Sequence, residues 1–121
     1  MAHEVRGVVD RYTRYRQREA DLAAAQDLLA DPELAGMARE EITAATADLE
    51  RLLRMTRRSV PEGVLSAGLG NAFLALGEAL AGLGRRDEAR TALDEALEHL
   101  EDAGGPTHPG TVRARALRGR L

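Results

Sequence analysis

Apolar residues near the start of the chain recur at steps of three, four or seven. The members of this series are Val5, Val8, Tyr12, Tyr15, Leu22 and Leu29. Such a stripe lies along one face of a helix, so it predicts an amphipathic, heptad-like helix. The series ends at Asp31, a good N-cap residue, and the next residue is Pro32, which suits a first helical position. We therefore expect a second helix to begin at Pro32.

A second stripe of apolar residues follows this turn, and Leu53 and Met55 widen it near its end. Its members are Leu34, Met37, Ala38, Ile42, Ala45, Leu49 and Leu52. Two helices of about 25 residues joined by so short a turn must fold back on each other, so residues 4–57 predict an antiparallel helical hairpin. Pro61 interrupts the pattern, and residues 58–64 are expected to form a linker in which Ser59 and Glu62 cap the next helix.

The remaining residues, 65–121, also show helical periodicity. Glycines at positions 63, 68 and 70 leave the start of the third helix open, and its periodic part runs over residues 71–83. Gly84 ends this helix, a fourth helix spans residues 85–104, and a short last helix occupies residues 109–121. The sequence thus predicts an all-α fold in which an antiparallel hairpin precedes a helix pair and a partial further helix.

Composition supports helices and narrows the chemistry. Aromatic residues make up only 2% of the 121 residues, so the apolar material is mainly Leu, Ala and Val. The absence of cysteine excludes disulfides, thiolate zinc sites and cysteine nucleophiles. The sequence has no long apolar run and no signal-like start, which indicates a cytoplasmic protein without membrane contact. The formal net charge of −3 excludes a strongly basic nucleic-acid binder.

Residues 71–89 resemble a tetratricopeptide repeat. Leu76, Gly77 and Leu80 stand where the first helix of such a repeat is apolar or small, and Ala89 is small where the second helix approaches. Residues 105–111 resemble the connector of the longer, kinesin-light-chain-like repeats, and the 42-residue offset of Gly77 from Gly119 (119 − 77) fits their period. One repeat is complete and the next is partial, so the pair must pack on something else.

The resemblance implies a binding surface along the first helix of the repeat. Helical phase alone selects Asn71, Leu74 and Glu78 as partner-binding residues, joined by Phe73 if it is exposed and by Gly82. These residues would line a groove for a peptide or a partner helix.

Residues 8–12, 21–34 and 38–42 are similar to the helical N-terminal region of bacterial class I peptide chain release factors. In that family this region contacts the base of the ribosomal stalk, and a separate core performs release. The sequence contains no Gly-Gly-Gln tripeptide, so the resemblance implies no release activity. Arg11, Arg14 and Arg18 form a basic row at i, i+3 and i+7 that would suit RNA phosphates. The alternative is that this row is the exposed flank of a coiled coil.

The sequence predicts no catalytic residue, no metal site and no cofactor. His3, His99 and His108 are far apart, and none has a partner at i+4. His108 is expected to cap a turn and His99 to lie on the acidic face of its helix. Adjacent carboxylates such as Asp94 and Glu95 point about 100° apart on a helix, so they do not converge on a substrate.

Charge is distributed unevenly over the second half. Residues 87–102 contain seven acids and one arginine, a net −6, whereas residues 109–121 contain four arginines and no acid, a net +4. These segments are expected to face each other, and the alternative is that the basic end docks an acidic partner.

The sequence therefore favours a non-enzymatic protein–protein interaction module that binds a peptide or partner helix. One alternative is a ribosome- or translation-associated factor that uses the hairpin. Another is a structural protein that forms homo-oligomers through its exposed heptads.

Overall fold

The computed structural model describes the backbone of residues 2–59 and 67–121, and the side chains of residues 13–55 and 67–121. Over this described part, the chain forms five α helices and no strand, which confirms the predicted all-α class. The helices fall into two compact units, Met1–Glu62 and Gly63–Leu121. Most of the linker predicted at residues 58–64, with its Ser59–Glu62 cap, lies outside the described residues.

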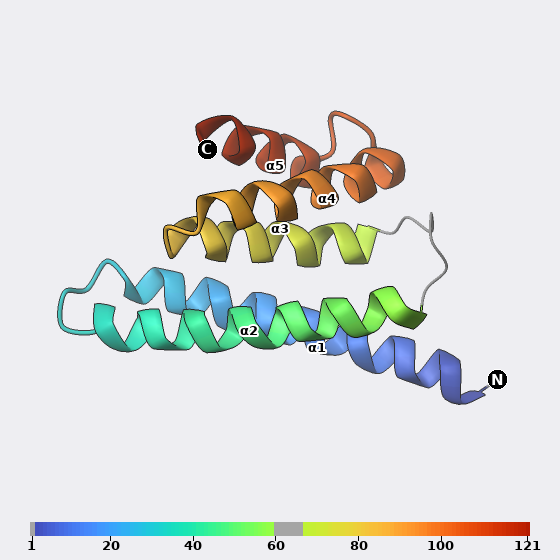
Figure 1. The fold of residues 1–121 in the computed structure, drawn as a ribbon, viewed down its shortest axis with the longest axis horizontal. Coiled ribbons are helices and arrows are strands. Elements are labelled where there is room, and N and C mark those ends of the chain that lie inside the picture. The colour runs from blue at the N-terminus through green and yellow to red at the C-terminus, as the bar shows by residue number, and fades with distance from the viewer. Residues whose placement is uncertain (1, 60–66) are drawn as a thin grey trace. The chain divides into compact units, whose positions relative to one another are not determined.

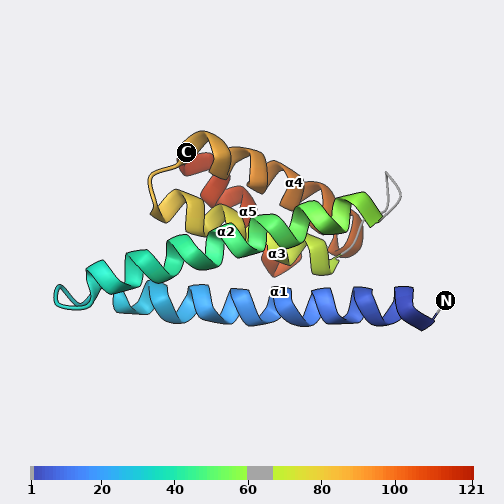
Figure 2. The same cartoon turned by 60° about the horizontal axis from the view of Figure 1, so that its bottom comes forward.

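Two long helices form the first unit. The helices α1 (Ala2–Leu28) and α2 (Ala35–Ser59) run antiparallel and side by side (Figures 1 and 2). Their larger buried side chains are Tyr15, Leu22, Ile42, Leu49, Leu52 and Leu53. The Tyr15 hydroxyl donates a hydrogen bond to the Leu52 carbonyl at 3.3 Å, which fixes the register of the two helices. The predicted hairpin is confirmed, although the side chains of Val5, Val8 and Tyr12 lie outside the described residues.

The turn between these helices differs from the prediction. The second helix begins at Ala35 and not at Pro32. The Asp31 carboxylate accepts a hydrogen bond from the Glu33 amide at 3.0 Å, and the Asp31 carbonyl accepts one from the Leu34 amide at 3.1 Å. Aspartate thus closes a local turn before the helix, because its short side chain competes with helical hydrogen bonding.

Two residues assigned to the buried stripe of the second helix lie outside it. Met37 is 59% exposed and Met55 is 47% exposed. Their neighbours Ala38, Leu52 and Leu53 fill the buried face, and each step along a helix turns a side chain by about 100°. The stripe is therefore narrower than the sequence pattern suggested.

Three helices form the second unit, in which α3 (Ala67–Gly82) packs antiparallel on α4 (Arg86–Gly104). Gly84 joins them with φ +79°, a left-handed conformation that favours glycine. The last helix, α5 (Pro109–Arg120), packs mainly on α4 and also on α3 (Figure 1). The His108 Nδ1 accepts a hydrogen bond from the Gly110 amide at 3.2 Å, which confirms that His108 caps this turn.

Glycines allow α3 and α4 to approach closely. A Cβ at Gly77 would lie 2.7 Å from Leu93 Cγ, and a Cβ at Gly70 would lie 2.7 Å from Leu100 Cγ. Real Cβ atoms do not sit that close, so each leucine of α4 fills the space that a larger residue of α3 would need. Both leucines are buried. This contact is the core of the second unit.

Adding a methyl group at this contact is predicted to destabilise the second unit. We expect Gly77→Ala to lower the melting temperature by several degrees, because overpacking costs about 1–3 kcal/mol and exceeds the roughly 1 kcal/mol that alanine gains in a helix. Gly119→Ala is the matched control, since no atom of the described residues lies within 4 Å of a Cβ at that position of α5. It should leave the melting temperature unchanged or raise it. Equal melting temperatures for the two variants, measured by circular dichroism, would contradict the close packing at Gly77.

Candidate partner-binding surfaces

The three repeat residues selected from the sequence lie on one side of α3, where α5 approaches. Asn71 is exposed, and its Oδ1 would lie 3.5 Å from a Cβ at Gly110. Leu74 is 7% exposed and so is buried between Asn71 and Glu78. Glu78 forms an ion pair with Arg113 of α5, with Nε and Oε1 2.8 Å apart. The structure thus brings Asn71 and Glu78 to one edge and adds Arg113, which the sequence reasoning had not placed there.

The carboxylate of Glu78 at this edge is largely shielded from solvent. Burial raises its pKa above the usual range for glutamate, and the charge and hydrogen bond of Arg113 act in the opposite direction. Desolvation is the larger cause, because the Glu78 side chain is only 19% exposed while that of Arg113 is 68% exposed. The Arg113 guanidinium is therefore the part of this ion pair that solvent or a partner can reach.

His99 does not lie on the acidic face of its helix, contrary to the prediction. It is buried, and its imidazole stacks on the Phe73 ring with centroids 5.8 Å apart and an interplanar angle of 12°. The aromatic partner on the facing helix explains the burial, because a flat ring of this size fills the space between α3 and α4. Phe73 is accordingly a core residue and not an exposed groove residue, whereas Gly82 is exposed.

Ion pairs join the basic last helix to the acidic fourth helix. Arg115 Nη2 lies 2.6 Å from Glu101 Oε1, and Arg118 Nε lies 2.9 Å from Asp94 Oδ1. The expectation that these two segments face each other is confirmed. Exposed pairs of this kind contribute about 0–1 kcal/mol each, so they orient α5 more than they stabilise it.

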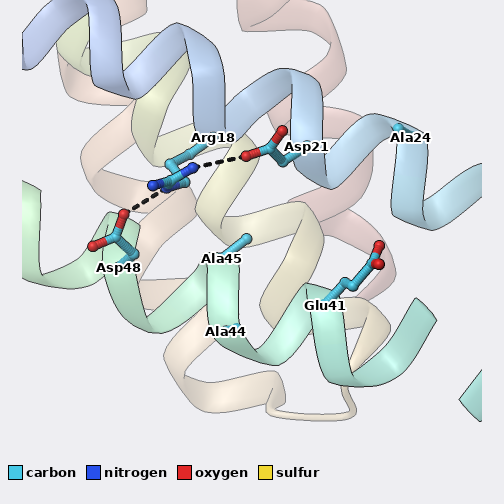
Figure 3. A pocket seen from close by; sticks show the side chains of 7 residues that line it. All are labelled: Arg18, Asp21, Ala24, Glu41, Ala44, Ala45 and Asp48. Carbon is cyan, nitrogen blue, oxygen red and sulfur yellow. Dashed lines mark hydrogen bonds and ion pairs between the residues drawn. The ribbon is translucent and has the colours of Figure 1, made fainter. Parts of the chain in front are cut away.

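The basic row on α1 is only partly a cationic surface. Arg14 is exposed, and the side chain of Arg11 lies outside the described residues. The Arg18 guanidinium bridges two carboxylates, with Nε 2.5 Å from Asp48 Oδ2 and Nη1 2.8 Å from Asp21 Oδ2 (Figure 3). The charge of Arg18 is thereby balanced within the hairpin.

These charges border a cleft of about 500 Å³ between α1 and α2. Its lining residues are Arg18, Asp21, Ala24, Glu41, Ala44, Ala45 and Asp48 (Figure 3). Sequence reasoning missed this cleft, since Asp48 meets Arg18 only through the register of the hairpin. The i, i+3 spacing of Arg18 and Asp21 was the one local signal.

Asp48 is held in its charged form by two guanidinium groups. The hydrogen bond from Arg18 lowers the pKa of Asp48 below the usual range for aspartate, and Arg51, 2.5 Å away, lowers it further. The hydrogen bonds to Asp48 and Asp21 raise the pKa of Arg18, so Arg18 and Asp48 both stay ionised at neutral pH. This ion-pair network ties α1 to α2.

We predict that the tie between Arg18 and Asp48 stabilises the hairpin at neutral pH and fails in acid. A depressed carboxyl pKa contributes stability above the ordinary aspartate pKa of about 4, and this is lost as the pH falls through the folded value. Asp48→Asn should lower the melting temperature by a few degrees at pH 7, consistent with a pair worth no more than about 1 kcal/mol. The deficit should shrink as the pH falls below the ordinary aspartate pKa, and it should vanish below the lowered pKa of folded Asp48.

The control is Asp27→Asn, which changes an exposed carboxylate on the same hairpin. It should not reproduce the pH-dependent deficit in thermal melts of the full chain. A deficit for Asp48→Asn that persists unchanged in acid would show that the carboxylate charge is not its origin.

Two further observations on the described residues concern metal binding and membrane-spanning helices. Among the described residues, no group of three or more His, Asp or Glu side chains is arranged to hold a metal ion. Over the same residues, none of the helices is both long and apolar enough to cross a membrane.

Comparison with known proteins bears on both units. Residues 68–121 match the family model for the tetratricopeptide repeat. A peptide chain release factor 1 from Paracidovorax citrulli is 65% identical over 49 residues, which are 40% of this chain and 14% of the relative. Another from Leptothrix cholodnii is 44% identical over 107 residues, 85% of this chain and 28% of the relative. A third from Variovorax paradoxus is 45% identical over 92 residues, 75% of this chain and 24% of the relative.

The chain spans 14% to 28% of the length of these three relatives. A match over 85% of the chain must draw on both units, so this similarity extends beyond the stretch recognised in the sequence. No solved structure matches the chain. Both resemblances are therefore shown: the chain is similar to the tetratricopeptide repeat over residues 68–121 and to peptide chain release factor 1 over a larger part of its length.

Proposed function

We propose that this chain is a non-enzymatic, cytoplasmic protein–protein interaction module that binds a peptide or partner helix through its helical-repeat surface. The observation that carries the proposal is the edge between α3 and α5, where Asn71, Glu78 and Arg113 present polar groups from two adjacent helices. The match of residues 68–121 to the tetratricopeptide repeat supports it, because stacked helical repeats create extended binding surfaces.

The chemistry of this edge suits a polar segment of a partner. Asn71 is exposed, and its amide offers both a donor and an acceptor to a peptide backbone. The Arg113 guanidinium has five donor N–H groups, of which Glu78 accepts only part, so the rest can bind a partner carbonyl or carboxylate. Leu74 supports the edge from beneath, since it is buried between the two polar residues.

Substitution of the two polar residues of α3 should weaken partner binding without unfolding the unit. The partner is first captured by crosslinking and then purified. We expect its affinity for the double variant Asn71→Ala, Glu78→Gln to be lower by about tenfold or more. Gln keeps the shape of Glu78 and can still bond Arg113, so the melting temperature should change little.

Glu98→Ala is the control variant, because Glu98 is an exposed carboxylate of α4 and is not one of the three residues of this edge. It should bind the purified partner as the unsubstituted chain does. Equal affinities for all three proteins, measured by calorimetry, would remove the α3–α5 edge as the binding surface.

A second function is a translation-associated role, in which the hairpin binds the ribosome through the row of Arg11, Arg14 and Arg18. The similarity to proteins named peptide chain release factor 1, over as much as 85% of the chain, favours it. Of the two arginines of the row whose side chains are described, Arg14 is exposed while Arg18 is committed to Asp48, so Arg14 is better placed than Arg18 to contact phosphate.

Co-sedimentation with purified ribosomes tests this second function. We expect binding that falls steeply with salt, because guanidinium–phosphate contacts release counterions, and that weakens severalfold in Arg14→Ala. Arg39→Ala, which removes an exposed arginine from α2, is the matched control and should retain binding. Absence of the chain from the ribosome pellet at low salt would exclude the role.

A further inference from the structure

One face of α3 consists of residues at positions i, i+3 and i+7, and α4 packs against it. Gly70, Phe73 and Gly77 occupy these positions, and all three are buried. Leu93 of α4 fills the space beside Gly77, and His99 of α4 stacks on Phe73. The contact between α3 and α4 therefore has two parts: Leu93 packs against Gly77, and the His99 ring stacks on the Phe73 ring.

The same face recurs on α5 with an offset of 42 residues. Val112 (112 − 70), Arg115 (115 − 73) and Gly119 (119 − 77) occupy the corresponding positions, and all three are exposed. Val112 is 53% exposed, and no atom of the described residues lies within 4 Å of a Cβ at Gly119. Within the second unit, the described helices α3 and α4 leave this face of α5 uncovered.

We propose that the α5 face formed by Val112, Arg115 and Gly119 docks an amphipathic helix of a partner protein. That helix carries a leucine for the Gly119 site and a carboxylate for Arg115. The inference rests on the proposed interaction function and specifies the chemistry of one partner and the surface that receives it.

The leucine of the partner helix is inferred from Gly119, by comparison with Gly77. At Gly77 the missing Cβ lets the whole Leu93 side chain reach the backbone of α3, at 2.7 Å from where a Cβ would lie. Gly119 offers the same opening near the end of α5, because no atom of the described residues lies within 4 Å of a Cβ there. Burying a leucine against this opening would be favourable.

The carboxylate of the partner helix is inferred from Arg115. On α4 the residue six positions after Leu93 is His99, which meets Phe73. On α5 the corresponding position is Arg115, whose side chain is 51% exposed and pairs with Glu101 of α4. Glu101 uses two of the five donors of this guanidinium, so the remaining donors can bind a second carboxylate.

A small residue must follow this carboxylate. On α4 the next residue, Leu100, occupies the space beside Gly70, but the corresponding position of α5 is Val112, whose side chain already fills that space. The docked helix therefore reads leucine, then Asp or Glu six residues later, then alanine. A second copy of α5 does not fit, because the net +4 of residues 109–121 would face itself.

The test uses a labelled synthetic peptide with the sequence of residues 86–104 that carries the substitutions His99→Glu and Leu100→Ala. Titration with the full chain, followed by fluorescence anisotropy, should show saturable binding. Gly119→Ala should weaken it about tenfold by filling the leucine site, while the melting temperature of this variant should be no lower than that of the unsubstituted chain. A control peptide with Leu93→Ala as well should not bind.

A charge exchange tests the second contact. The chain variant Arg115→Glu should bind the same peptide about tenfold more weakly, and a peptide with His99→Arg in place of His99→Glu should recover the affinity. Binding that is equal for the unsubstituted chain, Gly119→Ala and Arg115→Glu would mean that the peptide displaces α4 instead, and it would overturn the proposal. So would the absence of binding.

Two outcomes separate this inference from its alternatives. A dimer in sedimentation velocity that Gly119→Ala dissolves would show that a second copy covers the face, which overturns the partner helix. If the peptide does not bind while the Asn71→Ala, Glu78→Gln variant still loses its partner, only this inference fails. If that variant also retains its partner, the proposed function fails with it.

Discussion

The approach of α3 to α4 at Gly77 is the contact on which the second unit depends. A leucine side chain rests directly on the backbone of the opposing helix, and a methyl group at Gly77 would collide with Leu93. The two helices can therefore lie close enough to bury alanines between them, including Ala72, Ala89 and Ala96. With one phenylalanine in the chain, this close packing takes the place of a core built from large side chains.

Charges have a different role in each unit. In the hairpin, Arg18 and Arg51 converge on Asp48, so opposite charges join the two helices beside a cleft. In the second unit, Arg115 and Arg118 orient α5 on the acidic surface of α4. In the second unit Arg113 and Arg115 already have a carboxylate partner, so binding there must use donors that those carboxylates leave free.

Local sequence patterns predicted the helices well. They failed where a side chain suits two local structures or lies at the border of the buried face. The carboxylate of Asp31 was equally suited to an N-cap or to a turn, and it closes the turn. Met37 and Met55 matched the apolar spacing approximately, yet the buried face is narrower than that spacing allowed. Of the candidate site residues, Asn71 and Glu78 were found by helical phase, while Arg113 was not, because it comes from a different helix.

The sequence by itself determined the all-α class, the hairpin, the cap at His108 and the 42-residue offset between α3 and α5, since each depends on spacing or on neighbouring residues. Only the tertiary structure decided that His99 stacks on Phe73 and that the charge of Arg18 is balanced by Asp48. It also decided that Leu93 packs against Gly77, while no described residue packs against Gly119. These properties depend on what the facing helix presents. A single helix specifies its own faces, but packing decides which of them are covered.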